Sequence, residues 1–162
     1  MAVVRGAARG VRDRLADMSH VRAHVRTATA ADAEELAALS GEFGYPSTSS
    51  QVRGRLTLLD DPERTLLVVE AEGRLAGFID VHVQRVVEAD PYAEVGGLVV
   101  RAEHRGRGLG AALLAAAATW ARERGLVVMW IRANLAREGV HEFYPAAGCR
   151  RVKDQRVYEY PL

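Results

Sequence analysis

The residues best suited to chemistry lie in a short glycine- and arginine-rich run, Arg105-Gly106-Arg107-Gly108-Leu109-Gly110. A strand-like stretch precedes this run and an alanine-rich, helix-like stretch follows it, so backbone N–H groups and the positive end of a helix should converge on one point. Glycine allows a close approach of the backbone, and arginine adds charge-assisted hydrogen bonds to phosphate oxygens. We therefore predict a phosphate-binding turn here, and not merely a glycine-rich connection with solvated arginines.

Two common nucleotide motifs do not fit this run. A dinucleotide fingerprint needs an acidic residue at the end of the next strand, where this chain has Ala133-Asn134. A Walker loop needs Gly-Lys-Ser or Gly-Lys-Thr, which does not follow the glycines. Nucleotide hydrolysis is therefore not expected.

The same run resembles the signature of the GNAT acetyltransferases, Arg-x-x-Gly-x-Gly or Ala after a strand, which here is Arg105, Gly108 and Gly110. The stretch from Tyr92 to Arg105 looks like the fourth strand of that family, and Asn134 and His141-Glu-Phe-Tyr144 look like its later motif. The resemblance runs from about residue 21 to residue 160. It implies the GNAT fold, with acetyl-CoA as co-substrate and no metal.

The resemblance also implies where acetyl-CoA binds. Its pyrophosphate would lie on the backbone amides from Arg107 to Gly110, and its pantetheine arm would pair like an added strand where two parallel strands separate after Val100 and Val127. Asn134 has two open roles, a bond to the pantetheine or the capping of the following helix. The implied binding residues are Leu98, Val99, Val100, Arg105, Gly106, Arg107, Gly108, Leu109, Gly110 and Asn134.

An amine acceptor needs a base, because a lysine-type amine has a pKa of about 10.4 and is mostly protonated at neutral pH. Glu94, whose position resembles that of the family's usual acid, is the candidate, with a water relay, Glu88 or Asp90 as alternatives. Gly96 stands where close relatives often carry a second acid. By the same resemblance, Tyr144 would protonate the departing thiolate, although a tyrosine beside an aromatic neighbour also suits simple packing.

Hydrophobic periodicity predicts the elements that must position these residues. Thr29 with Asp32 and Thr48 with Gln51 resemble capping boxes, and Glu72-Gly73 predicts a tight hairpin turn. The expected strands cover 20–27, 66–69, 75–87, 92–100 and 127–131, with one bent or two short strands in 149–160, and the expected helices cover 29–43, 48–61, 109–124 and 136–147. This order predicts an α/β fold with a mixed sheet of six to seven strands and about four helices on its two faces.

Composition limits the remaining possibilities. The 162 residues fit one domain, for which we expect residues 21–162, after a flexible extension in residues 1–20. Twenty-two Lys plus Arg against 21 Asp plus Glu give a net charge of +1, which favours neither nucleic acid nor a membrane surface. The single cysteine, Cys149, excludes an intrachain disulfide, and neither a zinc motif nor a membrane-spanning run occurs. A cytoplasmic protein is expected.

The acceptor stays open at this level. A primary amine of a small molecule or a peptide fits, and an aminoglycoside would need several carboxylates around the groove, for which Glu42, Asp60, Asp61, Glu88, Asp90 and Glu94 are available. The rival interpretation is a catalytically silent module that binds acetyl-CoA as a sensor. A homodimer through edge strands is a further expectation.

Overall fold

A computed structural model describes residues 23–57, 59–137 and 139–162 of the chain. The chain divides into two compact units, Met1–Ile131 and Arg132–Leu162. The predicted N-terminal extension, residues 1–20, lies outside the described residues. Within the described ranges, no helix combines the length and the apolar character that crossing a membrane requires.

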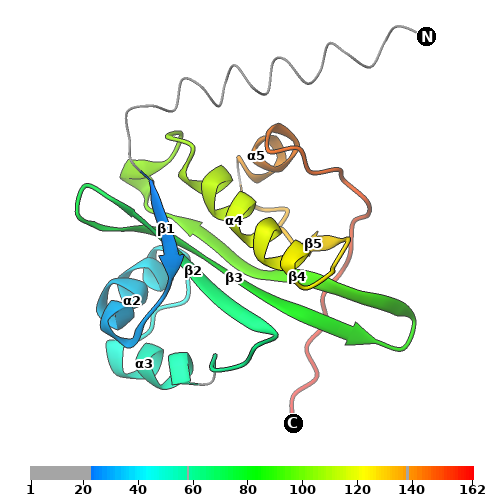
Figure 1. Ribbon diagram of the computed structural model, residues 1–162, viewed down its shortest axis with the longest axis horizontal. Helices are drawn as coiled ribbons and strands as arrows, with labels where there is room; N and C mark the ends of the chain where they lie inside the picture. The colour runs from blue at the N-terminus through cyan, green and yellow to red at the C-terminus, as the bar shows by residue number, and fades with distance from the viewer. Residues whose placement is uncertain (1–22, 58, 138) are drawn as a thin grey trace, which may run out of the picture. The chain divides into compact units, whose positions relative to one another are not determined.

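The first unit is built on a five-stranded sheet with the order β1-β2-β3-β4-β5 (Figure 1). Strands β1 to β4 pair antiparallel with their neighbours, whereas β5 is parallel to β4. A helix lies in the connection from β4 to β5, as a parallel crossover requires. The strands are β1 His24–Thr27, β2 Arg64–Ala71, β3 Arg74–Val86, β4 Ala89–Val100 and β5 Met129–Ile131.

Helices α2 (Ala33–Glu42) and α3 (Ser49–Thr57) cover one face of this sheet. They pack on it through a buried cluster that brings together Leu36 and Leu39 of α2, Val52 of α3, Val68 of β2 and Val99 of β4. A leucine buried in this way contributes about 2 kcal/mol to stability. The cluster therefore ties the first helical pair to the strand that carries the candidate site.

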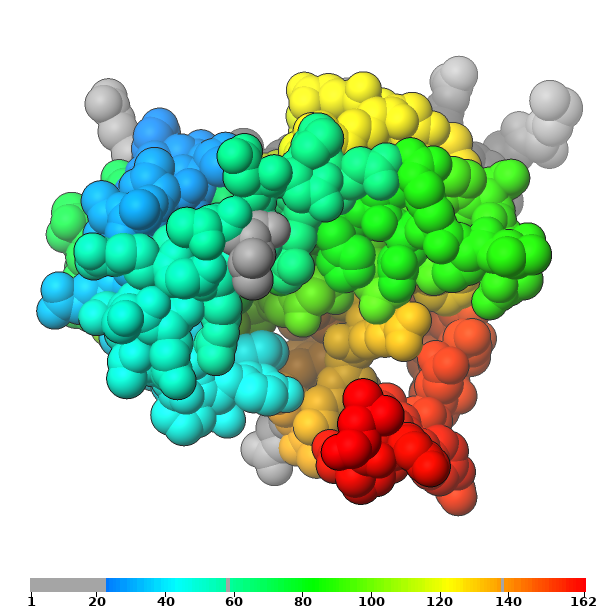
Figure 2. Space-filling view, turned by 90° about the horizontal axis from the view of Figure 1, so that it is seen from below, coloured from blue at the N-terminus to red at the C-terminus, as the bar shows by residue number. Residues whose placement is uncertain are grey.

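Helix α4 (Leu109–Glu123) packs on β2, β3 and β4 from the opposite face. Figure 2 shows the strands lying between α4 and the α2–α3 pair. Four buried residues at four-residue spacing form the apolar stripe of α4: Leu109, Leu113, Ala117 and Ala121. The prediction of a mixed sheet with helices on both faces is thus confirmed.

Both predicted capping boxes are present. The carboxylate of Asp32 accepts the N–H of Thr29 at 2.7 Å, so an aspartate here replaces the usual glutamate. The amide oxygen of Gln51 accepts the N–H of Thr48 at 2.9 Å, and the Thr48 hydroxyl accepts the N–H of Gln51 at 3.2 Å. These local bonds set where a 3-10 turn at Ala30–Asp32 and helix α3 begin.

The predicted β2–β3 hairpin turn is also present. Glu72 and Gly73 both have positive φ, 56° and 78°, which is the conformation of a two-residue type I′ turn. Glycine adopts this conformation without cost, whereas a glutamate does so less readily. The turn fixes the register of β2 against β3 and, through β3, that of β4.

The predicted strands in 149–160 are wrong, so the sheet has five strands and not six to seven. The second unit contains one helix, α5 (Val140–Ala146), and residues 149–162 form no strand. A strand needs partners for its N–H and C=O groups and an apolar face to bury, yet Val157, Tyr158 and Tyr160 are exposed. Alternation of apolar and polar residues in 149–160 was therefore not sufficient to predict a strand. With α5 included, four α-helices are present among the described residues.

Candidate functional site

The glycine turn lies between β4 and α4, after a short 3-10 turn at Ala102–His104. Gly106 and Gly108 have φ values of 74° and 79°, in the left-handed region that residues with a side chain rarely adopt. Gly108 is also the N-cap of α4, without a side chain that could cap the helix. The turn therefore needs glycine for its backbone shape.

Backbone N–H groups at the start of α4 have no acceptor within the helix. The first intrahelical bond of this helix runs from the N–H of Ala112 to the C=O of Gly108, at 3.0 Å. The N–H groups of residues 108–111 precede it, as at every helix N-terminus. They point along the axis toward the positive end of the helix dipole, which suits an anion.

The two arginine side chains of the turn are bound to other parts of the protein. Nε of Arg105 donates to the C=O of Val100 at 3.1 Å. Nη1 of Arg107 donates to the carboxylate of Glu72, in the β2–β3 turn, at 2.8 Å. In this state the turn presents backbone donors, while its guanidinium groups brace it against β4 and the hairpin.

The pairing of β4 with β5 is short and leaves a stretch of β4 open. It joins Ala93–Val95 to Met129–Ile131, after which β4 continues to Val100 with no strand on that side among the described residues. From the sequence, β4 and β5 were expected to separate after Val100 and Val127. That position was wrong, because β4 bulges near Gly96, where its register with β3 shifts.

The alternation of an antiparallel ladder decides which groups of β4 face the open side. The N–H of Arg101 donates to Ala76 of β3 at 2.8 Å, so Arg101 and Val99 bond toward β3. Leu98 and Val100 then direct their N–H and C=O groups away from β3, in agreement with the bond from Arg105 to the Val100 C=O. Of the three predicted arm-binding residues, Leu98 and Val100 have suitable backbone groups.

Glu94 lies directly opposite His82 of β3 and in register with Trp130 of β5. Opposed residues of an antiparallel pair lie on the same face of the sheet. Phe78 of β3 packs against the α2–α3 cluster. Asp80 and His82 follow it at two-residue spacing, so their side chains lie on the same face of the sheet as that of Phe78. Glu94 lies on this face too, because it is opposite His82. Glu94 is half-buried immediately before the open stretch, whereas Glu88 and Asp90 are exposed at the β3–β4 turn.

Sequence reasoning missed Asp80. Its carboxylate forms a two-point ion pair with Arg64, with Nε–Oδ1 at 3.0 Å and Nη2–Oδ2 at 2.5 Å, and this hydrogen bonding raises the pKa of Arg64. A Cβ added at Gly96 would lie 3.1 Å from Oδ2 of Asp80. Asp80 therefore brings a carboxylate next to the position where relatives were expected to carry a second acid. Only the strand register reveals this, because the two residues are far apart in the chain.

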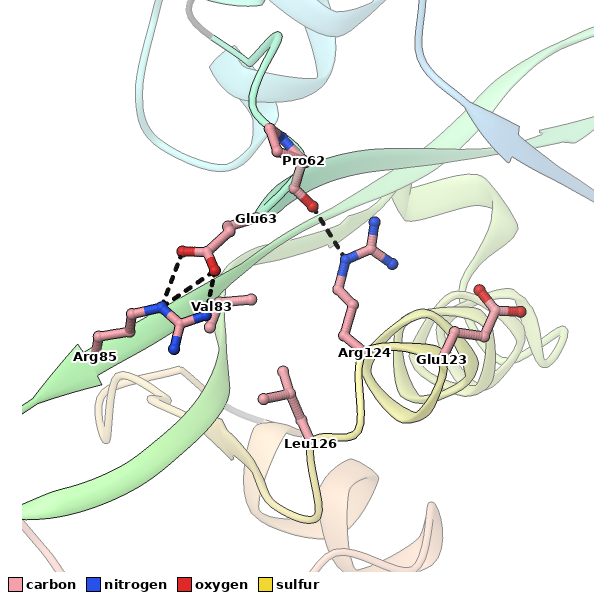
Figure 3. Close-up of a pocket in the computed structure, with 7 residues that line it drawn as sticks. All are labelled: Pro62, Glu63, Val83, Arg85, Glu123, Arg124 and Leu126. Atoms are coloured by element: carbon pink, nitrogen blue, oxygen red, sulfur yellow. Dashed lines mark hydrogen bonds and ion pairs between the residues drawn. The ribbon is translucent and has the colours of Figure 1, made fainter.

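A pocket with a volume of about 520 Å³ lies elsewhere. Figure 3 shows two of its arginines bonded within the pocket: Arg85 bonds to Glu63, and Nε of Arg124 donates to the C=O of Pro62 at 3.0 Å. It lies at the C-terminal end of α4 and contains none of the predicted site residues. The glycine turn and the open stretch of β4 remain the better candidate.

The second unit carries the last two predicted site residues. The side-chain oxygen of Asn134 accepts the N–H of Ala136 at 2.9 Å, so Asn134 shapes the turn that leads toward α5. Tyr144 lies on α5 with its ring 5.0 Å from that of Phe143. Burial, with a smaller contribution from Cys149, raises the pKa of Tyr144, so its phenol keeps its proton at neutral pH.

No group of three or more His, Cys, Asp or Glu side chains among the described residues is placed to hold a metal ion. The first unit holds the turn, the open stretch of β4 and Glu94 together. Tyr144 and Asn134 belong to the second unit.

Comparisons with known proteins agree with this arrangement. A family model described as the acetyltransferase (GNAT) family matches residues 30–148. The streptothricin acetyltransferase of Streptomyces lavendulae is 35% identical over 89 residues, which cover 52% of this chain and 43% of that protein. The chain therefore spans less than half of the length of this relative.

Solved structures show the same fold. The aminoglycoside 6′-N-acetyltransferase AAC(6′)-IG from Acinetobacter haemolyticus has a TM-score of 0.73 at 16% identity, covering 86% of this chain and 99% of that one. The structure of AAC(6′)-Iy in complex with a bisubstrate analogue of CoA and acetylneamine has a TM-score of 0.76 at 17% identity, covering 87% and 99%. At these identities the likeness establishes the fold alone.

Proposed function

This chain belongs to the GNAT acetyltransferase family, and we propose that it transfers an acetyl group from acetyl-CoA to a primary amine, through a domain that spans residues 21–162. One observation carries the proposal: the glycine turn, whose N–H groups at residues 108–111 have no acceptor within α4, comes one short 3-10 turn after a strand that has no partner strand beside Gly96 to Val100 among the described residues. The first feature suits a phosphate and the second suits an amide-containing arm.

The residues present fit acetyl-CoA. The N–H groups of residues 108–111 would hold its pyrophosphate, since glycines at 106 and 108 keep the approach free of side chains. The N–H and C=O groups of Leu98 and the N–H of Val100 would pair with the amides of its arm, while Val99 anchors the strand in the core. When bound, acetyl-CoA supplies the activated acetyl thioester.

Glu94 is the proposed base, acting directly or through a water molecule. It is the carboxylate nearest along β4 to the open stretch, and it lies on the face that α2 and α3 cover. An ionised carboxylate there attracts the ammonium form of the acceptor and can take its proton. Tyr144 is the proposed proton donor to the leaving thiolate, since its half-buried phenol is protonated at neutral pH.

The acceptor is proposed to be a small-molecule amine, with aminoglycosides and peptide amino termini as the classes to test first. Solved neighbours that are aminoglycoside acetyltransferases support the first class. Two of the carboxylates considered for a polycation are already bound: Glu42 accepts from Arg101 at 3.0 Å, and Asp61 accepts the N–H of Glu63 at 2.8 Å. The other carboxylates considered for this role are Asp60, Glu88, Asp90 and Glu94.

The decisive experiment is a calorimetric titration of the purified protein with acetyl-CoA, together with Gly108→Leu and its matched control, Gly125→Leu. Both glycines have φ near 75°, at the two ends of α4, and a side chain at Gly125 would meet open space. Both variants should lose about 1 kcal/mol of stability from backbone strain, and only Gly108→Leu should lose binding.

An amine screen by CoA release completes the test. Neamine, streptothricin, glucosamine 6-phosphate, a polyamine and a short peptide cover the acceptor classes. Folded wild-type protein that does not bind acetyl-CoA would contradict the proposal. Binding without turnover on any amine would favour the acetyl-CoA sensor over the enzyme.

A further inference from the structure

A row of charged and titratable side chains crosses three strands on the face that α2 and α3 cover. In register, Arg64 of β2 lies opposite His82 of β3, and His82 lies opposite Glu94 of β4. Directly opposed side chains have Cβ atoms about 4.5–5.5 Å apart. Asp80, on the same face of β3, completes the row through its ion pair with Arg64. The proposed base therefore has an imidazole as its nearest neighbour across the sheet.

His82 has an unusual hydrogen-bonding state. Its Nδ1 is fully buried and has no hydrogen-bond partner among the described residues, whereas Nε2 is not a buried unpaired atom. Leaving a buried polar atom unpaired costs about 1–3 kcal/mol, so such an atom in a folded protein calls for an explanation. His82 thus keeps one unpaired nitrogen buried in the sheet surface.

The other charged groups near His82 have interactions of their own. The guanidinium of Arg64 is already neutralised by the two-point bond to Asp80. Helix α2 also packs on β3 and brings Glu35 and Glu42, but these bond to the N–H of Leu75 and to Arg101, at the other end of β3. Tyr92, next on the face of β4, is engaged edge-on with Trp130 at 6.4 Å. Glu94 is the carboxylate directly opposite the imidazole.

We infer that His82 is a positioning residue of the acetyl-transfer site, which holds Glu94 in its ionised form by accepting the proton that Glu94 takes from the amine. This inference rests on the proposed function. It goes further by assigning a role to a residue of β3 that lies outside every motif of the sequence, and by making the base a carboxylate–imidazole pair and not a lone carboxylate.

The proton balance is complete without any added reagent. The acceptor arrives as R–NH₃⁺ and gives one proton to the Glu94 carboxylate, directly or through a water molecule. Neutral His82 accepts that proton at Nε2 and becomes an imidazolium, while Glu94 returns to its ionised form. The amine lone pair forms the C–N bond as the C–S bond breaks, and the sulfur keeps the electron pair of that bond. The nitrogen loses its second proton to solvent as the amide forms, while the thiolate takes one proton from the phenol of Tyr144, which solvent reprotonates. His82 then releases its proton to solvent. R–NH₃⁺ and acetyl-CoA thus give the amide, CoA thiol and one released proton.

The test is the pH profile of kcat in wild type, His82→Gln and His82→Asn, with the best amine of the screen. Wild type should show a rising limb on the acid side, because a protonated imidazole cannot accept the proton from Glu94. Both substitutions should flatten this limb and lower kcat about tenfold at pH 7. His24→Gln is the matched control, because His24 also faces a carboxylate, at 3.9 Å from Glu70, but is exposed on β1. It should leave the profile unchanged.

Glu94→Gln adds a readout with His82 intact, which keeps the test valid even if both His82 variants fold poorly. If the proton reaches His82 through Glu94, Glu94→Gln should also lose the imidazole limb, and adding His82→Gln to it should change kcat less than twofold. Unchanged pH profiles, or effects of the two substitutions that multiply, would overturn the inference.

The two proposals can fail separately. Calorimetric binding of acetyl-CoA by the His82 variants, within about twofold of wild type, shows that the cofactor site is intact. Active wild type with a profile that does not respond to His82→Gln or Glu94→Gln refutes the role of His82 alone. If wild type binds no acetyl-CoA or acetylates no amine of the screen, the proposed function and the role of His82 fall together.

Discussion

The glycine turn and the acceptor face, defined by Asp80, His82, Glu94 and Gly96, are the two halves of the proposed site, and they are built in opposite ways. The turn is one continuous segment, Arg105–Gly110, whose donors are backbone N–H groups at the start of α4. The acceptor face is assembled from β3 and β4 by register, and its chemistry lies in side chains. The turn should thus be sensitive to backbone shape and the acceptor face to the exchange of single functional groups.

The charged groups of the glycine turn and of the acceptor face also have different roles. The arginines of the turn are bound to Val100 and Glu72, so they brace the loop in this state. On the acceptor face, Arg64 pairs with Asp80, and the carboxylate of Glu94 lies opposite the imidazole of His82. Binding of the donor substrate and handling of the amine proton should therefore be separable by mutation. The predictions below test that separation, from the largest expected effect to the smallest.

Glu94→Gln should lower kcat by about 10²- to 10³-fold, because it removes the proposed base, while the dissociation constant of acetyl-CoA stays within about twofold. Steady-state kinetics and calorimetry measure the two quantities. Glu88→Gln, at the exposed end of the β3–β4 hairpin, is the matched control and should retain activity. A lower kcat with Glu88→Gln and an unchanged kcat with Glu94→Gln would show that the base is Glu88 in the β3–β4 hairpin and not a residue of the acceptor face.

Tyr144→Phe should lower kcat about 10- to 100-fold with little change in acetyl-CoA binding, since it removes only the phenolic proton. Because the pKa of Tyr144 is raised, the protonated phenol persists above its ordinary value of 10.0. Activity should therefore not fall through its ionisation until the pH exceeds about 10. Tyr158→Phe, an exposed tyrosine of the same unit, is the control. Equal activity of Tyr144→Phe and wild type would show that packing is the role of this tyrosine.

Arg107→Ala should weaken acetyl-CoA binding only about three- to tenfold, because the backbone N–H groups remain and the exposed guanidinium is shared with Glu72. Glu72→Gln should tighten binding slightly by releasing that guanidinium. Calorimetry at two salt concentrations measures both, and the effect of Arg107→Ala should shrink at high salt. A loss as large as that of Gly108→Leu would show that the side chain, not the backbone, carries the phosphate site.

Asp32→Asn should affect neither region and reduce stability alone. Hydrogen bonds from Arg26 lower the pKa of Asp32 from 3.8 to about 2, opposed by burial. A depressed carboxyl pKa stabilises the fold above the unfolded value, and this contribution disappears as the pH falls from about 4 to about 2. The substitution should cost about 2 kcal/mol at pH 7 and progressively less below pH 4, as measured by urea unfolding. A constant difference over that range would contradict the assignment.

Much of the local structure was predictable because the residues that decide it are close in the chain. Thr29 with Asp32 and Thr48 with Gln51 form their capping bonds within one helical turn. Glu72-Gly73 forms the hairpin turn by its own backbone preference. The failures occurred where partners were needed: residues 149–160 alternate like a strand but have no ladder, and the opening beside β4 begins at Gly96 and not after Val100.

The sequence by itself determined the glycine turn, the helix caps, the hairpin and the family resemblance, since each depends on residue types at short, constant spacing. Only the tertiary structure decided that His82 faces Glu94, that Asp80 lies beside Gly96 and that β4 is open from Gly96 to Val100. The physical reason is strand register. A shift of one residue, or one bulge, turns every later side chain to the other face of the sheet, and no local pattern records where that shift occurs.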